Sequence, residues 1–180
     1  MANPRLWGIL VGGVVLTTLR AGQGAEPRSV AVVTIRNTSD AALRDAPVTF
    51  GQPLKRGAVP RGSELHAQAG GGPAQVDVKR CYDDGSRRFA VVSAIVPELP
   101  AGATQRIELH AGPATPGGTA LPLDAFLKTG FDAAIVLKFP DGAERSIGAR
   151  ALLQDAKEAP KTWLRGPAAT EWIVAGHPLD

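Results

Sequence analysis

Glycine and proline interrupt this chain at short intervals along most of its length. Its 180 residues include 21 glycines and 15 prolines, which fall between short apolar segments rather than in one tract. No stretch longer than about ten residues has the apolar periodicity of an amphipathic helix. Many short strands separated by turns are typical of sandwiches and barrels. The sequence therefore predicts an all-β fold, a small barrel or sandwich of short antiparallel strands.

Asp-Gly dipeptides mark two of the predicted hairpins. Asp84-Gly85 and Asp141-Gly142 each lie between two strand-like segments, and glycine takes the positive φ of a tight turn without steric cost. The segment 87–96 (RRFAVVSAIV) is the most apolar, so we expect it at the centre of a sheet. The other expected strands are 29–36, 47–51, 64–68, 74–80, 104–110, 131–139, 145–153, 161–165 and 170–175, with one helical turn at 124–128.

The first 25 residues are basic, then apolar, then small. Arg5 precedes the uncharged segment 6–19, and small residues lead up to Ala25. This order is typical of a secretory signal peptide, and the segment is shorter than the roughly 20 residues that span a bilayer. A strand pair turning at residues 12–13 is the second interpretation. The first predicts a secreted or periplasmic protein, and neither predicts a stable membrane span.

Charge gives little support for nucleic-acid binding. The formal net charge is +3, and removing the two arginines of residues 1–25 leaves 18 basic against 17 acidic residues. A nucleic-acid interface needs basic residues clustered on one face. We interpret the basic residues of this chain as a solvated strand face in preference to a patch for a polyanion; they are Arg56, Arg61, Lys79, Arg80, Arg87 and Arg88.

The single cysteine, Cys81, excludes an internal disulfide. It lies in a segment of alternating character, so we expect it to be buried. Asn37-Thr38-Ser39 matches a glycosylation acceptor, a three-residue pattern that is common by chance.

Two segments, 46–60 (APVTFGQPLKRGAVP) and 74–102, resemble the N-terminal domain of exo-rhamnogalacturonan lyase-like proteins. That domain is a RIFT-type β-barrel, and similar modules occur in phage tail-associated proteins. The shared pattern is a Pro-Val-Thr-Phe-Gly strand start, a Pro-x-x-x-Gly loop, a glutamine before a strand, and an aromatic-x-Asp-Gly-Ser hairpin. The residues that carry the pattern are Phe50, Gly51, Gly57, Gln75, Tyr82, Asp84, Gly85 and Ser86.

The resemblance implies a barrel over residues 26–112, with 113–180 as a further β-hairpin region. It implies no lyase activity for these residues, because the family places catalysis in a large helical domain. The motif also differs here, since Tyr82-Asp83 replaces the family's Trp-Pro.

The chemistry of the motif residues by itself predicts a structural role for each of them, whether or not the chain is related to the family. Phe50 is expected to anchor a strand, and Gly51 and Gly57 to permit sharp loops. Gln75 is expected to satisfy loop backbone groups, and Asp84-Gly85 to set the register of its hairpin.

No catalytic, cofactor or metal site is expected. His66, His110 and His177 are far apart in the sequence and lack ligands at useful spacing. Ser86 has no G-x-S-x-G context. Tyr82, Trp163 and Trp172 are candidates for stacking against a sugar, with core anchoring as the favoured interpretation.

These observations favour a non-catalytic β scaffold or interaction module, the accessory N-terminal part of an exported carbohydrate-active protein. The alternative is a structural adaptor of a phage tail or similar assembly, located in the virion. The expected partners are other protein domains or chains, with polysaccharide second and nucleic acid excluded.

Overall fold

The computed structural model describes residues 28–115, 117–155 and 160–176. These residues are mostly β-strand with two short helices, so the all-β prediction is confirmed. The predicted signal peptide or strand pair at 1–25 lies outside the described residues.

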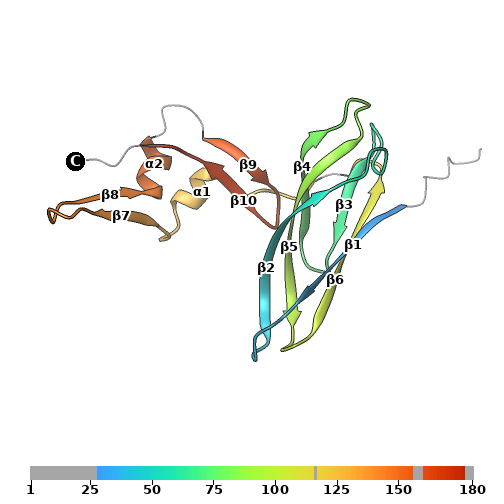
Figure 1. Cartoon of the computed structure of the whole chain (residues 1–180), viewed down its shortest axis with the longest axis horizontal. Coiled ribbons are helices and arrows are strands. Elements are labelled where there is room, and N and C mark those ends of the chain that lie inside the picture. Colours follow the sequence, from blue (N-terminus) through green and yellow to red (C-terminus); the bar gives the residue numbers. More distant parts are fainter. Residues whose placement is uncertain (1–27, 116, 156–159, 177–180) are drawn as a thin grey trace, which may run out of the picture.

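Two three-stranded antiparallel sheets face each other and form a sandwich (Figure 1). They do not close into a barrel within the described part of the chain. Most expected strands appear within a few residues of their predicted bounds, and 87–96 lies at the centre of its sheet as predicted. One sheet has the order β1 (Arg28–Arg36), β6 (Thr104–Gly112), β3 (Glu64–Gln68), and the other β2 (Leu43–Pro53), β5 (Arg87–Leu99), β4 (Ala74–Cys81).

The core lies between the two sheets, because alternate side chains of each strand point inward. Ile107 and Leu109 of β6 are fully buried, as is Val92 of β5. Val59 closes this core from the loop between β2 and β3 and is also fully buried. Phe50 packs against the same cluster from β2, in line with its expected role as a strand anchor.

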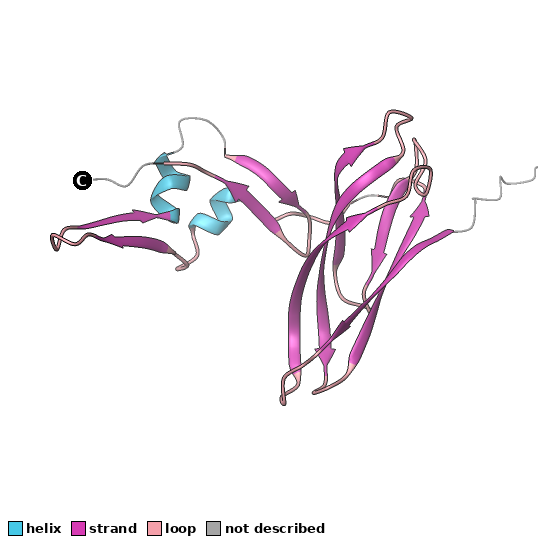
Figure 2. Cartoon of the chain, in the orientation of Figure 1, coloured by secondary structure: helices cyan, strands magenta, loops and turns pink. Residues whose placement is uncertain are grey.

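Residues 117–155 and 160–176 form a C-terminal unit that extends to one side of the sandwich (Figure 1). Both helices belong to this unit (Figure 2). The expected helical turn is α1. The elements of the unit are α1 (Leu123–Leu127), β7 (Ala134–Lys138), β8 (Glu144–Gly148), α2 (Ala149–Asp155), β9 (Lys161–Arg165) and β10 (Thr170–Ile173).

The strand predicted to return over 145–153 is shorter than expected. β8 ends at Gly148, and the chain continues as α2 with the sequence ARALLQD. Alanine, leucine, arginine and glutamine are strong helix formers. The apolar character of the segment was interpreted as strand, and short apolar runs do not separate the two structures.

Asn37 is a structural residue rather than an exposed glycan acceptor. Its side chain is 2% exposed, and Nδ2 donates to the carbonyl oxygens of Ala41, Leu99 and Pro100 at 2.7, 3.0 and 3.2 Å. The amide therefore joins the β1–β2 turn to the end of β5. Because the amide nitrogen is engaged and covered, the acceptor pattern at residue 37 is not available in the folded protein.

Substituting Asn37 with alanine is expected to lower the free energy of unfolding by about 1–3 kcal/mol, because buried carbonyl groups lose their donor. Urea denaturation measures the change. Thr38→Ala, at an exposed neighbouring position, is the matched control and should change stability by less than about 0.5 kcal/mol. Equal effects of the two substitutions would contradict the structural role of Asn37.

Cys81 is exposed, contrary to the prediction of a buried thiol. The pairing of β4 with β5 shifts register between Val78 and Arg80 and again between Arg80 and Cys81. A bulge interrupts the alternation of faces along a strand. The alternation between inward-facing and outward-facing side chains at the start of β4 therefore does not predict the direction of the Cys81 side chain.

Candidate interaction surface

Most of the sequence motif comes together at one end of the sandwich. Gly85 has φ +80°, and Asp84 accepts hydrogen bonds from the Ser86 backbone N–H at 2.9 Å and hydroxyl at 2.6 Å. The Ser86 hydroxyl in turn accepts the N–H of Gly57 at 3.0 Å, where φ is +74°. The hairpin 82–86 and the loop 53–57 are thus one hydrogen-bonded structure.

Gly51 has a different role from the one expected. It lies within β2, outside the positive-φ region. A Cβ atom there would lie 2.7 Å from Cζ of Phe89 on the neighbouring strand β5. The missing side chain therefore makes room for a ring rather than for a sharp loop.

The pKa of the Asp84 carboxyl lies below its ordinary value of 3.8. The Ser86 hydroxyl is the main cause and the Ser86 backbone N–H the second, because both donate to the charged form. A lowered pKa in the folded state contributes stability above the unfolded pKa of 3.8, and this contribution is lost as the pH falls through the folded pKa.

Asp84→Asn should therefore weaken the loss of stability in acid. Between about pH 5 and about pH 2.5, the free energy of unfolding should fall less in this variant than in the wild type. Urea denaturation at several pH values measures both curves. Asp40→Asn, which removes an exposed carboxylate from another turn, should keep the wild-type pH dependence. If Asp84→Asn kept the wild-type dependence of the free energy of unfolding on pH, the stabilising role of the Asp84 carboxylate would be refuted.

The three rings considered for sugar stacking lie in three separate environments. The Tyr82 hydroxyl donates to Leu54 O at 2.9 Å, and the guanidinium carbons of Arg56 and Arg88 lie 4.6 and 5.6 Å from its ring centroid. Lys79 Nζ lies 4.3 Å from the centroid of Trp163. The rings do not form a shared platform.

Trp172 is half-buried and packs within the C-terminal unit. Its ring lies 5.4 Å from that of Phe126 on α1, with an interplanar angle of 45°. Phe126 in turn lies 6.0 Å from Phe131. The contact joins β10 to α1.

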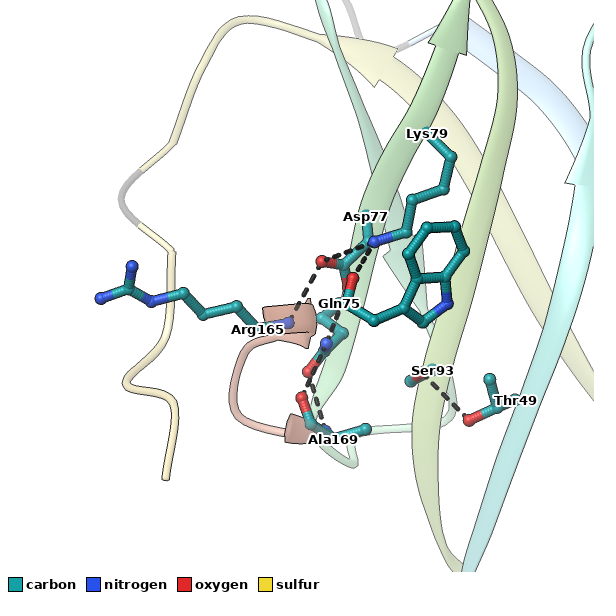
Figure 3. Close-up of polar contacts among 8 residues, drawn as sticks. Thr49, Gln75, Asp77, Lys79, Ser93, Arg165 and Ala169 are labelled. Atoms are coloured by element: carbon teal, nitrogen blue, oxygen red, sulfur yellow. Dashed lines mark hydrogen bonds and ion pairs between the residues drawn. The ribbon is translucent and has the colours of Figure 1, made fainter. Parts of the chain in front are cut away.

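Gln75 joins the C-terminal unit to the sandwich (Figure 3). Its Oε1 accepts the N–H groups of Ala168 and Ala169 at 2.9 and 2.8 Å, and its Nε2 donates to Ala169 O at 2.9 Å. Gly166 lies so close that a Cβ there would be 2.5 Å from Gln75 Oε1. Gln75 does satisfy loop backbone groups, and the loop belongs to the β9–β10 hairpin some 90 residues later.

Asp77 and Lys79 continue the junction along β4 (Figure 3). Asp77 Oδ1 accepts the backbone N–H of Arg165 at 3.2 Å, and Lys79 Nζ donates to Trp163 O. The two side chains are 3.6 Å apart and only 15% and 14% exposed. Lys79 was expected on a solvated strand face, and the C-terminal unit covers it together with Asp77 instead. Alternate residues of a strand point to the same face, so Gln75, Asp77 and Lys79 share one side of β4. This alternation is the sequence signal that could have found the site.

The basic residues do not act as one free patch. Arg56 Nη1 lies 3.6 Å from Asp84 Oδ2, and Arg87 donates to Ser63 O at 3.3 Å and to Cys81 Sγ at 3.5 Å. These contacts hold the side chains of Arg56 and Arg87 against the end of the sandwich that carries the hairpin 82–86.

His66 and His110 are brought together although they are distant in the sequence. They face each other in the β3–β6 pairing. His66 Nε2 is 2.8 Å from Pro113 O, and His110 Nε2 is 3.5 Å from Glu108 Oε2. Within the described residues, no three histidine, cysteine or acidic side chains are arranged to hold a metal ion. His177 lies outside these residues.

The β7–β8 hairpin with the preceding residues 131–133 forms an exposed arm, which we call the hairpin arm (residues 131–148). All five residues of β7 are exposed, and Ile135 reaches 63%. At its base, Arg150 of α2 donates to the carbonyl oxygens of Leu127, Thr129 and Phe131. The exposed large apolar side chains of the arm are Phe131, Ile135, Val136, Leu137 and Phe139.

Searches of protein-family models, curated proteins and solved structures found no match to this chain. Among the described residues, neither helix has the length or apolar character to cross a bilayer.

Proposed function

We propose that this chain is a non-catalytic β scaffold that binds another protein domain or chain through the hairpin arm. The carrying observation is the exposure of five large apolar side chains along the hairpin arm. Exposed apolar patches of this kind are typical of interaction sites.

The architecture of the arm supports this function. An isolated two-stranded hairpin is at best marginally stable in water, and further packing is needed to hold it. β7 and β8 pair only with each other among the described strands, so each has an unpaired edge that can accept a strand from a partner. Arg150 holds the base of the ribbon, so the apolar side chains are presented on a positioned element.

For the wider context, we propose an accessory module of an exported carbohydrate-active protein. The separate environments of Tyr82, Trp163 and Trp172 favour protein binding over direct sugar binding by this module. The alternative is an adaptor in a virion tail, and the unpaired strand edges of the arm favour it, because neighbouring subunits of an assembly can complete such edges.

Site-specific photo-crosslinking in the native source tests the proposal. A photoreactive residue at position 135 of the full chain should give a discrete adduct with another protein. The same residue at Val32, which is also an exposed apolar strand position at 42%, is the matched control and should give none. Adducts of equal yield at both positions, or none at either, would overturn the assignment to the arm.

Two further measurements separate the contexts. N-terminal sequencing of the native protein reports export if it begins near Glu26 and favours an assembly role if Met1 is retained. A glycan array containing acidic and neutral polysaccharide fragments tests direct sugar binding, and we expect no signal above background.

A further inference from the structure

A second candidate site lies in the C-terminal unit, away from the hairpin arm. A cleft of about 600 Å³ separates the β9–β10 hairpin from the loop 118–123 that precedes and begins α1. Ligand pockets have volumes of about 300–1,000 Å³. The hairpin contributes Thr162, Arg165, Thr170 and Trp172 to its walls.

An irregularity in the hairpin places these four side chains together. Arg165 pairs with Thr170 and Thr162 pairs with Trp172, while the register shifts between Glu171 and Trp172. Directly paired residues point to the same face of a two-stranded ribbon. The register shift leaves one residue of β9 without a partner, and such a bulge turns the side chain of the unpaired residue in a different direction. The unpaired residue is Trp163, and its ring lies against Lys79 of the sandwich rather than in the cleft.

The opposite wall is held by contacts that do not involve the side chains of Arg165 or Trp172. The N–H of Leu121 donates to the Thr170 hydroxyl at 3.1 Å. Gly118 lies so close to Pro167 that a Cβ at residue 118 would be 2.6 Å from the proline Cγ. These contacts hold the loop that carries Gly118 and Leu121 close to the β9–β10 hairpin.

The charge of the cleft has one sign. Arg165 is the only charged residue among those that line it, and no carboxylate accompanies it. In the described part of the chain, the Arg165 guanidinium has no hydrogen bond or ion pair, and the contact of this residue with Asp77 is made by its backbone N–H. Figure 3 shows this side chain extended away from the Gln75–Asp77–Lys79 junction. A guanidinium is the preferred partner of a carboxylate, which it binds with two parallel hydrogen bonds.

The other residues that line the cleft favour a ligand with a ring. Trp172 lines the cleft, and the ring of Phe126 on α1 lies 5.4 Å from its ring. Thr162 and Thr119 are also among the lining residues. An apolar ring surface with a few placed polar groups is the common composition of a small-molecule site. We infer that this cleft binds a small ring compound carrying one carboxylate, with the carboxylate on Arg165 and the ring against Trp172.

Heteronuclear NMR titration of the full chain tests the inference with four probes. Benzoate and glucuronate supply a carboxylate on an aromatic and on a sugar ring, and benzyl alcohol and methyl glucoside are their neutral counterparts. At least one carboxylate should shift the Trp172 indole N–H and the Leu121 amide saturably, with a roughly millimolar Kd. Its neutral counterpart should not, and the carboxylate that binds identifies the ring class.

Variants assign the binding to the cleft. Arg165→Gln should weaken the binding by about tenfold or more, because a charge-assisted contact is lost. Lys161→Gln removes one cation from an exposed position of the same strand outside the cleft lining and should change Kd by less than about twofold. Thr162→Val should reduce affinity without removing charge. Linear shifts with both carboxylates, equal binding of a neutral counterpart, or wild-type affinity of Arg165→Gln would each overturn the inference.

Discussion

Gln75→Ala is expected to release the C-terminal unit from the sandwich. The substitution removes three hydrogen bonds to the β9–β10 hairpin and one to Asp77 Oδ2, and it leaves the N–H groups of Ala168 and Ala169 without an acceptor. Each polar group left unsatisfied in a covered position costs about 1–3 kcal/mol, so we expect the junction to weaken by about 2–4 kcal/mol in total. Hydrogen exchange should show faster exchange of both amides, and limited proteolysis should show faster cleavage in the loop 113–122.

Gln52→Ala is the matched control for this prediction. Gln52 is also a strand glutamine, but its Nε2 donates only to the carbonyl of the adjacent Pro53. It should leave exchange at Ala168 and Ala169 unchanged. The urea midpoint of the sandwich should remain close to that of the wild type in both variants, because Gln75 is outside the apolar cluster. Unchanged exchange in Gln75→Ala would show that the glutamine does not hold the unit.

Leu109→Ala is expected to have the largest effect on the stability of the sandwich itself. Leu109 has no exposed surface and lies on β6, the central strand of its sheet. Truncating a fully buried leucine removes its transfer free energy and leaves a cavity, with a typical cost of about 2–5 kcal/mol. Urea denaturation followed by circular dichroism measures the change as a shift of the midpoint.

Val32→Ala is the control on the neighbouring strand β1. Its side chain is 42% exposed, and Val32 is paired with Glu108 rather than packed in the core. We expect a loss below about 1 kcal/mol. A comparable loss for the two variants would mean that β6 does not provide the centre of the core, and the two-sheet packing would have to be revised.

The candidate site was less predictable than the strands. The exposed apolar side chains of the hairpin arm were interpreted as an ordinary strand pair, because alternation and turn chemistry report that a hairpin forms and do not report whether another layer covers it. Arg165 was not singled out at all. Its place in the cleft depends on the loop 118–123, which is distant from β9 in the sequence and forms the opposite wall. The bulge at Trp163, which leaves Thr162 paired with Trp172, completes the lining, and no dipeptide in β9 or β10 marks it.

The amino-acid sequence by itself determined where the chain turns and which segments become strands, because these are local properties. Asp84-Gly85 specifies a tight turn through glycine's freedom at positive φ, and the apolar segment 87–96 specifies the central strand of its sheet. Only the tertiary structure decided which polar faces are covered. Gln75 meets Ala169 across 94 residues of chain, and such a pairing depends on how two units dock, a sum of many weak contacts that no local pattern records.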